Sequence, residues 1–200
     1  MESATLQQKM AQYHEFFTIK HALNVNVVPL DNDFSLPDAA NLVSNMPYAF
    51  QIASHMSSVD AQALRPLRNL GEHAKDLVEY LHHQNKKIDL MMSFILQQQD
   101  EERHRYRSVE FGGGGLAVET QEPMQEGQYV ELKVFLSEEA AGVFCYAEVI
   151  KCEPAEDGFH AYLLFSRIRE EDQELLVRAS LHLQTVQLRA RSKQQHNESN

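Results

Sequence analysis

Three arginines stand at alternate positions, Arg103, Arg105 and Arg107, and four consecutive glycines, Gly112–Gly115, follow a few residues later. Residues two apart on an extended strand point to the same side, so the three guanidinium groups could face one anion together. Exposed glycine amides could add hydrogen bonds to phosphate oxygens. One interpretation of this stretch is therefore a local phosphate-binding site.

The same stretch also permits a purely structural interpretation. The acidic neighbours Asp100, Glu101, Glu102 and Glu110 offer the arginines partners within the chain, and such clusters commonly form solvated ion-pair networks. The glycine run lacks a following Lys-Ser or Lys-Thr pair and leads into a strand pattern, which excludes a P-loop and a dinucleotide-binding fingerprint. In this interpretation the glycines form a bulge or a turn with positive φ.

A heptad pattern directly before the arginines predicts one long helix over residues 64–99. Flanking apolar residues, among them Tyr80 and Phe94, widen its apolar face beyond the seam of a two-stranded coil, which favours a bundle of more helices or a seam shared with another helix of the same chain. We therefore expect self-association, with a tetramer favoured over a dimer. The a and d positions are Leu67, Leu70, Ala74, Leu77, Leu81, Gln84, Ile88, Met91 and Ile95.

The region before this helix, residues 1–63, is predicted to be mainly helical. Leu6, Met10, Tyr13 and Phe17 follow helical spacing, which predicts an amphipathic helix from Ala4 to about His21. Two short helices are expected between residues 35 and 58, with Pro37 and Pro47 in their first turns behind Ser35 and Asn45 as caps. The alternating stretch NVNVVPL, residues 24–30, predicts a short edge strand.

After residue 100 the pattern changes to short β-rich runs separated by turn residues, which predicts about five antiparallel strands. Helical spacing returns from Glu170 to about Ala190, and residues 191–200 form a polar tail. The domain over residues 100–190 is thus a β-module with a C-terminal helix, and the fold class is α+β. Its expected core residues are Val109, Leu116, Val130, Leu132, Val134, Val149, Leu163 and Phe165.

Composition limits the classes of function. A net charge of -11 over 200 residues argues against broad binding to nucleic acid or to anionic membranes, and no uninterrupted segment has membrane length. We expect a soluble, cytoplasmic chain. Cys145 and Cys152 lie an odd number of positions apart, so on one strand they would point to opposite faces and remain reduced. Catalytic motifs are lacking, and the adjacent His82 and His83 diverge too far on a helix to chelate one metal, so neither an enzyme nor a metal cofactor is predicted.

Several motifs resemble those of the PilZ domain, the bacterial receptor module for cyclic di-GMP. Arg103 and Arg107 match its RxxxR pattern, and VEFGGGGL is similar to its second motif, V-[DN]-x-S-x-x-G-L. The resemblance covers about residues 100–190 and implies a β-barrel on which the arginines clasp the dinucleotide and the second motif holds a guanine edge. Gly115 matches that motif, whereas Glu110 stands in place of Asp or Asn and Gly112 in place of Ser.

The two motifs nearly abut here, although the family has an intervening strand between them, and NVNVVPL could supply the strand that is missing. A degenerate motif behind a long heptad helix resembles the atypical tetrameric PilZ subgroup, whose members oligomerise through such helices. The resemblance implies a non-enzymatic oligomeric adaptor or effector of cyclic di-GMP signalling that acts with an unknown signalling protein, with direct nucleotide binding weak or absent. The alternatives are a true receptor that binds through Arg103 and Arg107, and a structural coiled-coil scaffold.

Overall fold

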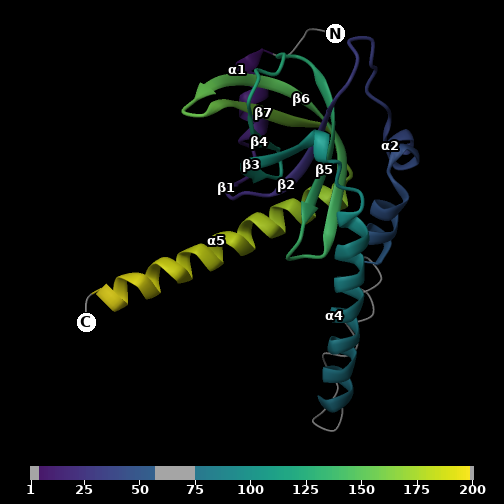
Figure 1. Ribbon diagram of the computed structural model, residues 1–200, viewed down its shortest axis with the longest axis vertical. Helices are drawn as coiled ribbons and strands as arrows, with labels where there is room; N and C mark the ends of the chain where they lie inside the picture. The colour runs from purple at the N-terminus through teal and green to yellow at the C-terminus, as the bar shows by residue number, and fades with distance from the viewer. Residues whose placement is uncertain (1–4, 57–74, 199–200) are drawn as a thin grey trace.

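The structure, a computed structural model, describes residues 5–56 and 75–198. It consists of one antiparallel β-barrel with helices before and after it, and two of these helices extend well beyond the barrel (Figure 1). This arrangement confirms the predicted α+β class.

Six strands close the barrel in the order β3–β2–β5–β6–β7–β4, and β4 pairs back onto β3. Every pairing is antiparallel, and a short strand β1, Thr18–Lys20, continues beside the second half of β3. The stretch NVNVVPL is therefore a barrel strand, as proposed, but it is not an edge because it pairs with β3 on one side and β5 on the other. The six strands are β2 Asn24–Pro29, β3 Arg105–Gly112, β4 Gly115–Thr120, β5 Tyr129–Leu136, β6 Ala141–Ala155 and β7 Gly158–Arg167.

The barrel interior contains most of the predicted core. Six of the eight residues, Leu116, Val130, Leu132, Val134, Val149 and Leu163, are fully buried. Phe165 is half-buried at the margin of the same cluster. Val109 lies outside the cluster because the register shifts between Ser108 and Glu110, and this irregularity turns Ser108 and Phe111 inward instead.

A second irregularity corrects the prediction for the cysteines. The β6–β7 register shifts between Val149 and Lys151, which changes the side-chain alternation along β6. Cys145 and Cys152 consequently pack against the same core cluster, not on opposite faces. Both are free thiols, and burial raises the pKa of Cys145 well above its ordinary value.

The N-terminal helices are shorter than their sequence patterns suggested. Helix α1 spans Leu6–Tyr13 behind a Thr5 capping box, and the chain then continues into β1, so Phe17 is outside the helix and exposed. Helix α2 spans Ala39–Asn45 with Asp38 as its N-cap, not Ser35. A further helical stretch, residues 48–56, follows Pro47.

Helix α4, Lys75–Gln97, ends before residue 99, and the expected seam residues Leu67, Leu70 and Ala74 lie outside the described residues. Its C-terminal turns contact the body through Met92 and Leu96, which pack with Phe50 and Phe144. None of the described seam positions belongs to this cluster: Leu77, Met91 and Ile95 are exposed, and Leu81, Gln84 and Ile88 are half-buried.

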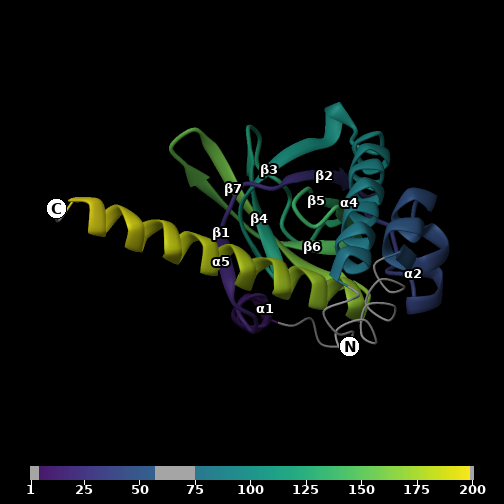
Figure 2. The same cartoon turned by 90° about the horizontal axis from the view of Figure 1, so that it is seen from below.

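Helix α5, Glu170–Glu198, continues past the predicted end near Ala190 and includes most of the residues expected to form a tail. Leu176, Ala179 and Leu183 anchor its first half in the barrel core, whereas the exposed Val186 marks where the helix leaves the barrel. Figure 2 shows α5 and α4 leaving the barrel in different directions. Within the described residues, no helix combines the length and apolar character needed to span a bilayer.

Candidate functional site

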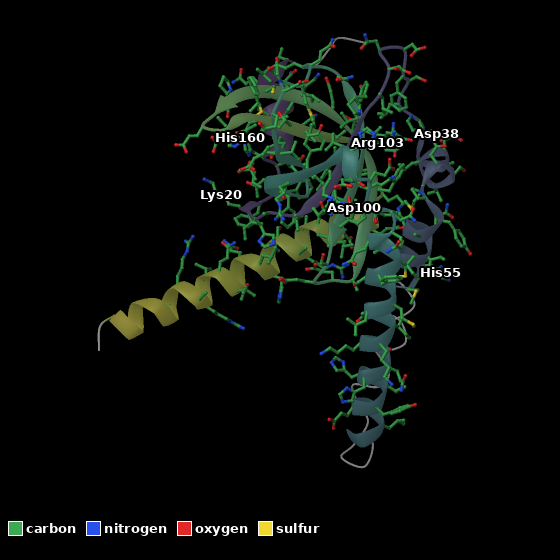
Figure 3. The ribbon with its side chains drawn as sticks, in the orientation of Figure 1. Lys20, Asp38, His55, Asp100, Arg103 and His160 are labelled. Carbon is green, nitrogen blue, oxygen red and sulfur yellow. The ribbon has the colours of Figure 1, made fainter. Side chains whose placement is uncertain are left out.

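The three arginines do not share one strand face. Arg105 and Arg107 belong to β3, but Arg103 lies in a single 3-10 turn, η2, Glu102–His104, that joins α4 to the barrel. Figure 3 shows Arg103 and Asp100 at this junction. The prediction of three converging guanidinium groups is wrong because the extended backbone begins only at Arg105.

Acidic neighbours engage two of the arginines. The Nε of Arg105 donates to an Asp100 oxygen at 2.8 Å, and Arg103 pairs with Glu101 at 3.6 Å while its side chain stays 80% exposed. Arg107 is exposed opposite Asn24, and it forms no ion pair with any residue that the structure describes. The ion-pair interpretation of this stretch thus holds for Arg105 and, at longer distance, for Arg103.

Asp100 is the centre of a network that ties the α4–β3 junction to the barrel. Its two carboxylate oxygens accept from Asn26 at 2.8 Å and from Asn24 at 2.9 Å, in addition to Arg105. Burial alone would raise the pKa of Asp100, but the hydrogen bonds from Asn26, Asn24 and Arg105 lower it below the ordinary value. We call Asp100, Asn24, Asn26 and Arg105 the Asp100 network.

Glu101 forms further hydrogen bonds at the same junction. Its carboxylate accepts from the Nζ of Lys133 at 2.6 Å, and its backbone amide donates to Asn26 at 2.9 Å. The hydrogen bond from the nearly buried Lys133 lowers the pKa of Glu101. Because Lys133 lies on β5 and Asn26 on β2, the segment that follows α4 is held against two barrel strands.

The glycine run is buried, and its backbone lies against the N-terminal segment. A methyl group on Gly115 would lie 2.7 Å from the Tyr13 ring, and one on Gly114 would lie 2.5 Å from the Tyr13 carbonyl oxygen. None of these four glycines has a positive φ. The run is therefore needed for close approach of another segment, and it offers neither the positive-φ turn nor the exposed amides that we expected.

Tyr13 fixes α1 over this run. Its ring is fully buried with Ile150 and Leu164 in a cluster outside the barrel core, and its hydroxyl donates to Glu110 at 3.1 Å. Burial, followed by the nearby Glu110 carboxylate, raises the pKa of Tyr13 well above its ordinary value. Sequence reasoning assigned Tyr13 only to an amphipathic helix; the signal that it missed was the glycine run, which requires a close neighbour.

The structure consequently separates Arg103 from the second half of the predicted ligand motif, whereas Arg107 lies on β3 together with Glu110. Arg103 and Arg105 line a surface pocket of about 540 Å³ together with Tyr106 and the loop residues 120–125. Glu110 instead contacts α1, and Gly112 and Gly115 are buried beneath the N-terminal segment. Arg103 and the second half of the motif thus face different surroundings.

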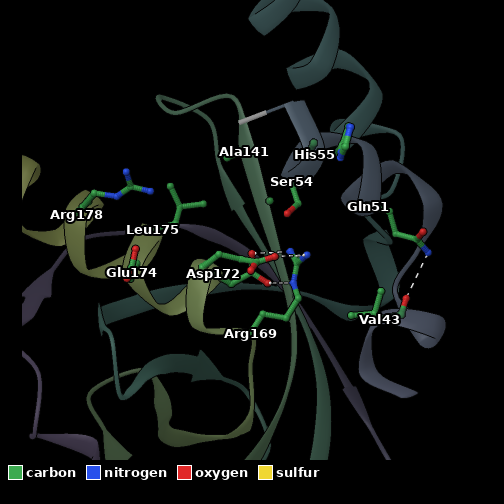
Figure 4. A pocket seen from close by; sticks show the side chains of 13 residues that line it. Val43, Gln51, Ser54, His55, Ala141, Arg169, Asp172, Glu174, Leu175 and Arg178 are labelled. Atoms are coloured by element: carbon green, nitrogen blue, oxygen red, sulfur yellow. Dashed lines mark hydrogen bonds and ion pairs between the residues drawn. The ribbon is translucent and has the colours of Figure 1, made fainter. Parts of the chain in front are cut away.

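A larger cavity, about 660 Å³, lies between residues 48–56 and the start of α5 (Figure 4). Asp172, a buried carboxylate in its lining, already accepts two hydrogen bonds of 2.7 and 2.8 Å from the Arg169 guanidinium. Ser54 and His55 also line this cavity, but adjacent helical residues point about 100° apart, unlike a nucleophile and its base. Among the described residues, no three His, Cys, Asp or Glu side chains are grouped to hold a metal ion.

Comparison with known proteins agrees with this architecture. The family model of the PilZ domain matches residues 82–182. No curated protein matches the chain. The inhibitor of motility MotI/DgrA of Bacillus subtilis is 25% identical over 42% of this chain, which spans only 44% of that protein's chain, with a TM-score of 0.38.

A second solved structure is similar over nearly the whole chain. It is a Xanthomonas campestris protein described as a new tetrameric PilZ domain that self-assembles through an unusual helical bundle. It is 14% identical and covers 90% of this chain and 96% of its own, with a TM-score of 0.51, a level of similarity that supports the fold. Since the family match extends over half of the sequence, the chain belongs to the PilZ domain family.

Proposed function

We propose that this protein is a non-enzymatic, self-associating adaptor of cyclic di-GMP signalling that binds the dinucleotide itself weakly or not at all. The observation that carries the proposal is the cover over the second motif. Tyr13 packs directly on Gly114 and Gly115, and its hydroxyl donates a hydrogen bond to Glu110. By the resemblance, Glu110 stands where the family has its guanine reader.

The arginine half of the motif supports the same proposal. Arg103 stands on the η2 turn beside the pocket of about 540 Å³ and pairs with Glu101, whereas Arg107 lies on β3. A ligand that used Arg103 and Arg107 would have to draw them from two different elements, the η2 turn and β3, and would find the second motif covered by Tyr13. Gly112 also lacks the serine hydroxyl, which by itself would weaken binding by about 1 kcal/mol, or about fivefold.

Self-association is supported by the apolar side chains that α4 leaves exposed. Met91 and Phe94 are 60% and 63% exposed, and Leu77, Tyr80, Leu90 and Ile95 are exposed beside them. Large apolar side chains exposed along one helix are typical of a surface that packs against a partner. We propose a tetramer formed through α4, by analogy with the helical bundle of the Xanthomonas protein.

Isothermal titration with cyclic di-GMP at low salt tests the nucleotide part, because Arg–phosphate attraction is screened least under this condition. We expect no saturable isotherm in the micromolar range. The Arg103→Ala/Arg107→Ala variant is the matched control. A micromolar isotherm that this variant abolishes would refute the proposal and establish a true receptor.

A further inference from the structure

The barrel carries a helix-binding groove on its outer surface, filled by the chain's own N-terminus. We define the α1 groove by Glu110, Gly114, Gly115, Glu148, Ile150 and Leu164. Ile150 and Leu164 are 4% and 8% exposed beneath Tyr13, and they form a cluster separate from the barrel core. The groove is therefore a local apolar site whose burial depends on α1.

The contacts between α1 and this groove show which side chains an occupant needs. The Tyr13 ring lies on Gly115, and its hydroxyl donates to Glu110 at one end. Lys9, one helical turn earlier, pairs with Glu148 at 2.5 Å. The carboxylates of Glu110 and Glu148 thus select a helix that presents a basic residue and, four positions later, a tyrosine.

Phe16, the next aromatic residue after Tyr13, also contacts the glycine run. Phe16 lies three positions after Tyr13, and a methyl group on Gly113 would come within 2.9 Å of the Phe16 ring. An occupant with the spacing Lys-x-x-x-Tyr-x-x-Phe therefore fills the groove and the glycine run together.

Helix α1 is held in a way that permits exchange. It has only eight residues, and a helix this short is marginal without tertiary contacts. Beyond it, β1 contributes three residue pairs with β3 before the chain enters the barrel at β2. Release of α1 is accordingly a local opening that leaves the closed ring of six strands intact.

We propose that the α1 groove is the docking site for a signalling partner, which inserts a segment of the Lys-x-x-x-Tyr-x-x-Phe type, helical up to its tyrosine, in place of α1. This inference rests on the adaptor function proposed above and identifies the surface through which the adaptor is engaged. The acidic rim and the glycine floor exclude an acidic or bulky competitor, and α1 keeps the groove closed until a partner is present.

Binding of a labelled peptide of residues 5–18 to the full chain tests the proposal by fluorescence anisotropy. The Tyr13→Ala chain, whose own segment competes less well, should bind the peptide at least tenfold more tightly than the wild-type chain. The same peptide with alanine at the tyrosine position should not bind. The Tyr48→Ala chain, which removes a 76% exposed tyrosine elsewhere, is the matched control and should behave as wild type.

Hydrogen exchange of the α1 amides reports whether the groove has opened in each variant. If Tyr13→Ala does not fold, Tyr13→Phe and Lys9→Ala, which keep the ring, replace it in the same comparison. An opened groove that binds both peptides equally, or neither, would overturn the proposal. A change in the particle mass of Tyr13→Ala would also overturn it, because α1 would then serve contacts between copies. None of these readouts involves cyclic di-GMP, so this inference can fail while the nucleotide part of the proposed function stands.

Discussion

The phenol oxygen of Tyr13 lies 3.1 Å from a carboxylate oxygen of Glu110, and this contact joins α1 to the strand that carries the PilZ ligand motif. Glu110, the residue that the sequence resemblance compares with the family's guanine reader, thereby accepts a hydrogen bond within the chain. The contact thus holds α1 over the glycine run.

Truncation of Tyr13 should destabilise the chain much more than loss of its hydroxyl alone. Tyr13→Phe removes one hydrogen bond and should lower the free energy of unfolding by about 1 kcal/mol. Tyr13→Ala leaves a cavity against Ile150 and Leu164 and should cost about 3 kcal/mol. Urea unfolding of both variants measures the difference; equal losses would mean that the ring does not support the fold.

Asp100→Asn should weaken the junction between α4 and the barrel in a pH-dependent way. The folded-state pKa of Asp100 is lowered, so its carboxylate stabilises the fold above its ordinary pKa, and this contribution disappears as the pH falls through the folded value. At pH 7 the variant should lose about 2 kcal/mol, and at pH 3 the gap from wild type should narrow.

Urea unfolding at these two pH values measures this effect. Asp33→Asn, which changes an exposed carboxylate in a loop, is the control and should leave stability unchanged at both. A gap that stays constant between pH 7 and pH 3 would contradict the assigned role of the Asp100 carboxylate.

Charges on the exposed seam of α4 should prevent assembly without unfolding the chain. Leu77 and Met91 are 54% and 60% exposed in the single chain, so Leu77→Asp and Met91→Asp leave its core intact but would bury a charge in a helical bundle. We expect both variants to sediment as monomers with native circular dichroism. Tyr48→Asp, outside α4, is the control; assembly that survives both seam substitutions would place the interface elsewhere.

Much of the fold followed from periodicity. Alternating β-rich runs predicted five of the strands and six buried core positions, and heptad spacing predicted the helix that includes α4. Errors arose where one irregular residue changes the alternation: the register shifts near Val109 and Val149 reversed the faces expected for Val109 and Cys152. Such irregularities depend on cross-strand partners distant in sequence, which local patterns do not contain.

The candidate site was predictable in its residue types but not in its geometry. Spacing placed Arg103 on a strand, whereas hydrogen bonds from Asn24 and Asn26 to Asp100 hold this segment as it leaves α4 and turns into β3. The glycine run indicated an unusual backbone environment, yet its cause, Tyr13, lies about a hundred residues earlier in the chain. Both determinants are contacts between segments far apart in sequence.

Light scattering of the wild-type chain with and without cyclic di-GMP tests the proposed self-assembly and the proposed lack of a nucleotide response together. Four copies of the 22.9 kDa chain predict a particle of about 92 kDa whose mass is unchanged by saturating cyclic di-GMP. A concentration-independent mass of 22.9 kDa, or a mass that shifts when the dinucleotide is added, would contradict it.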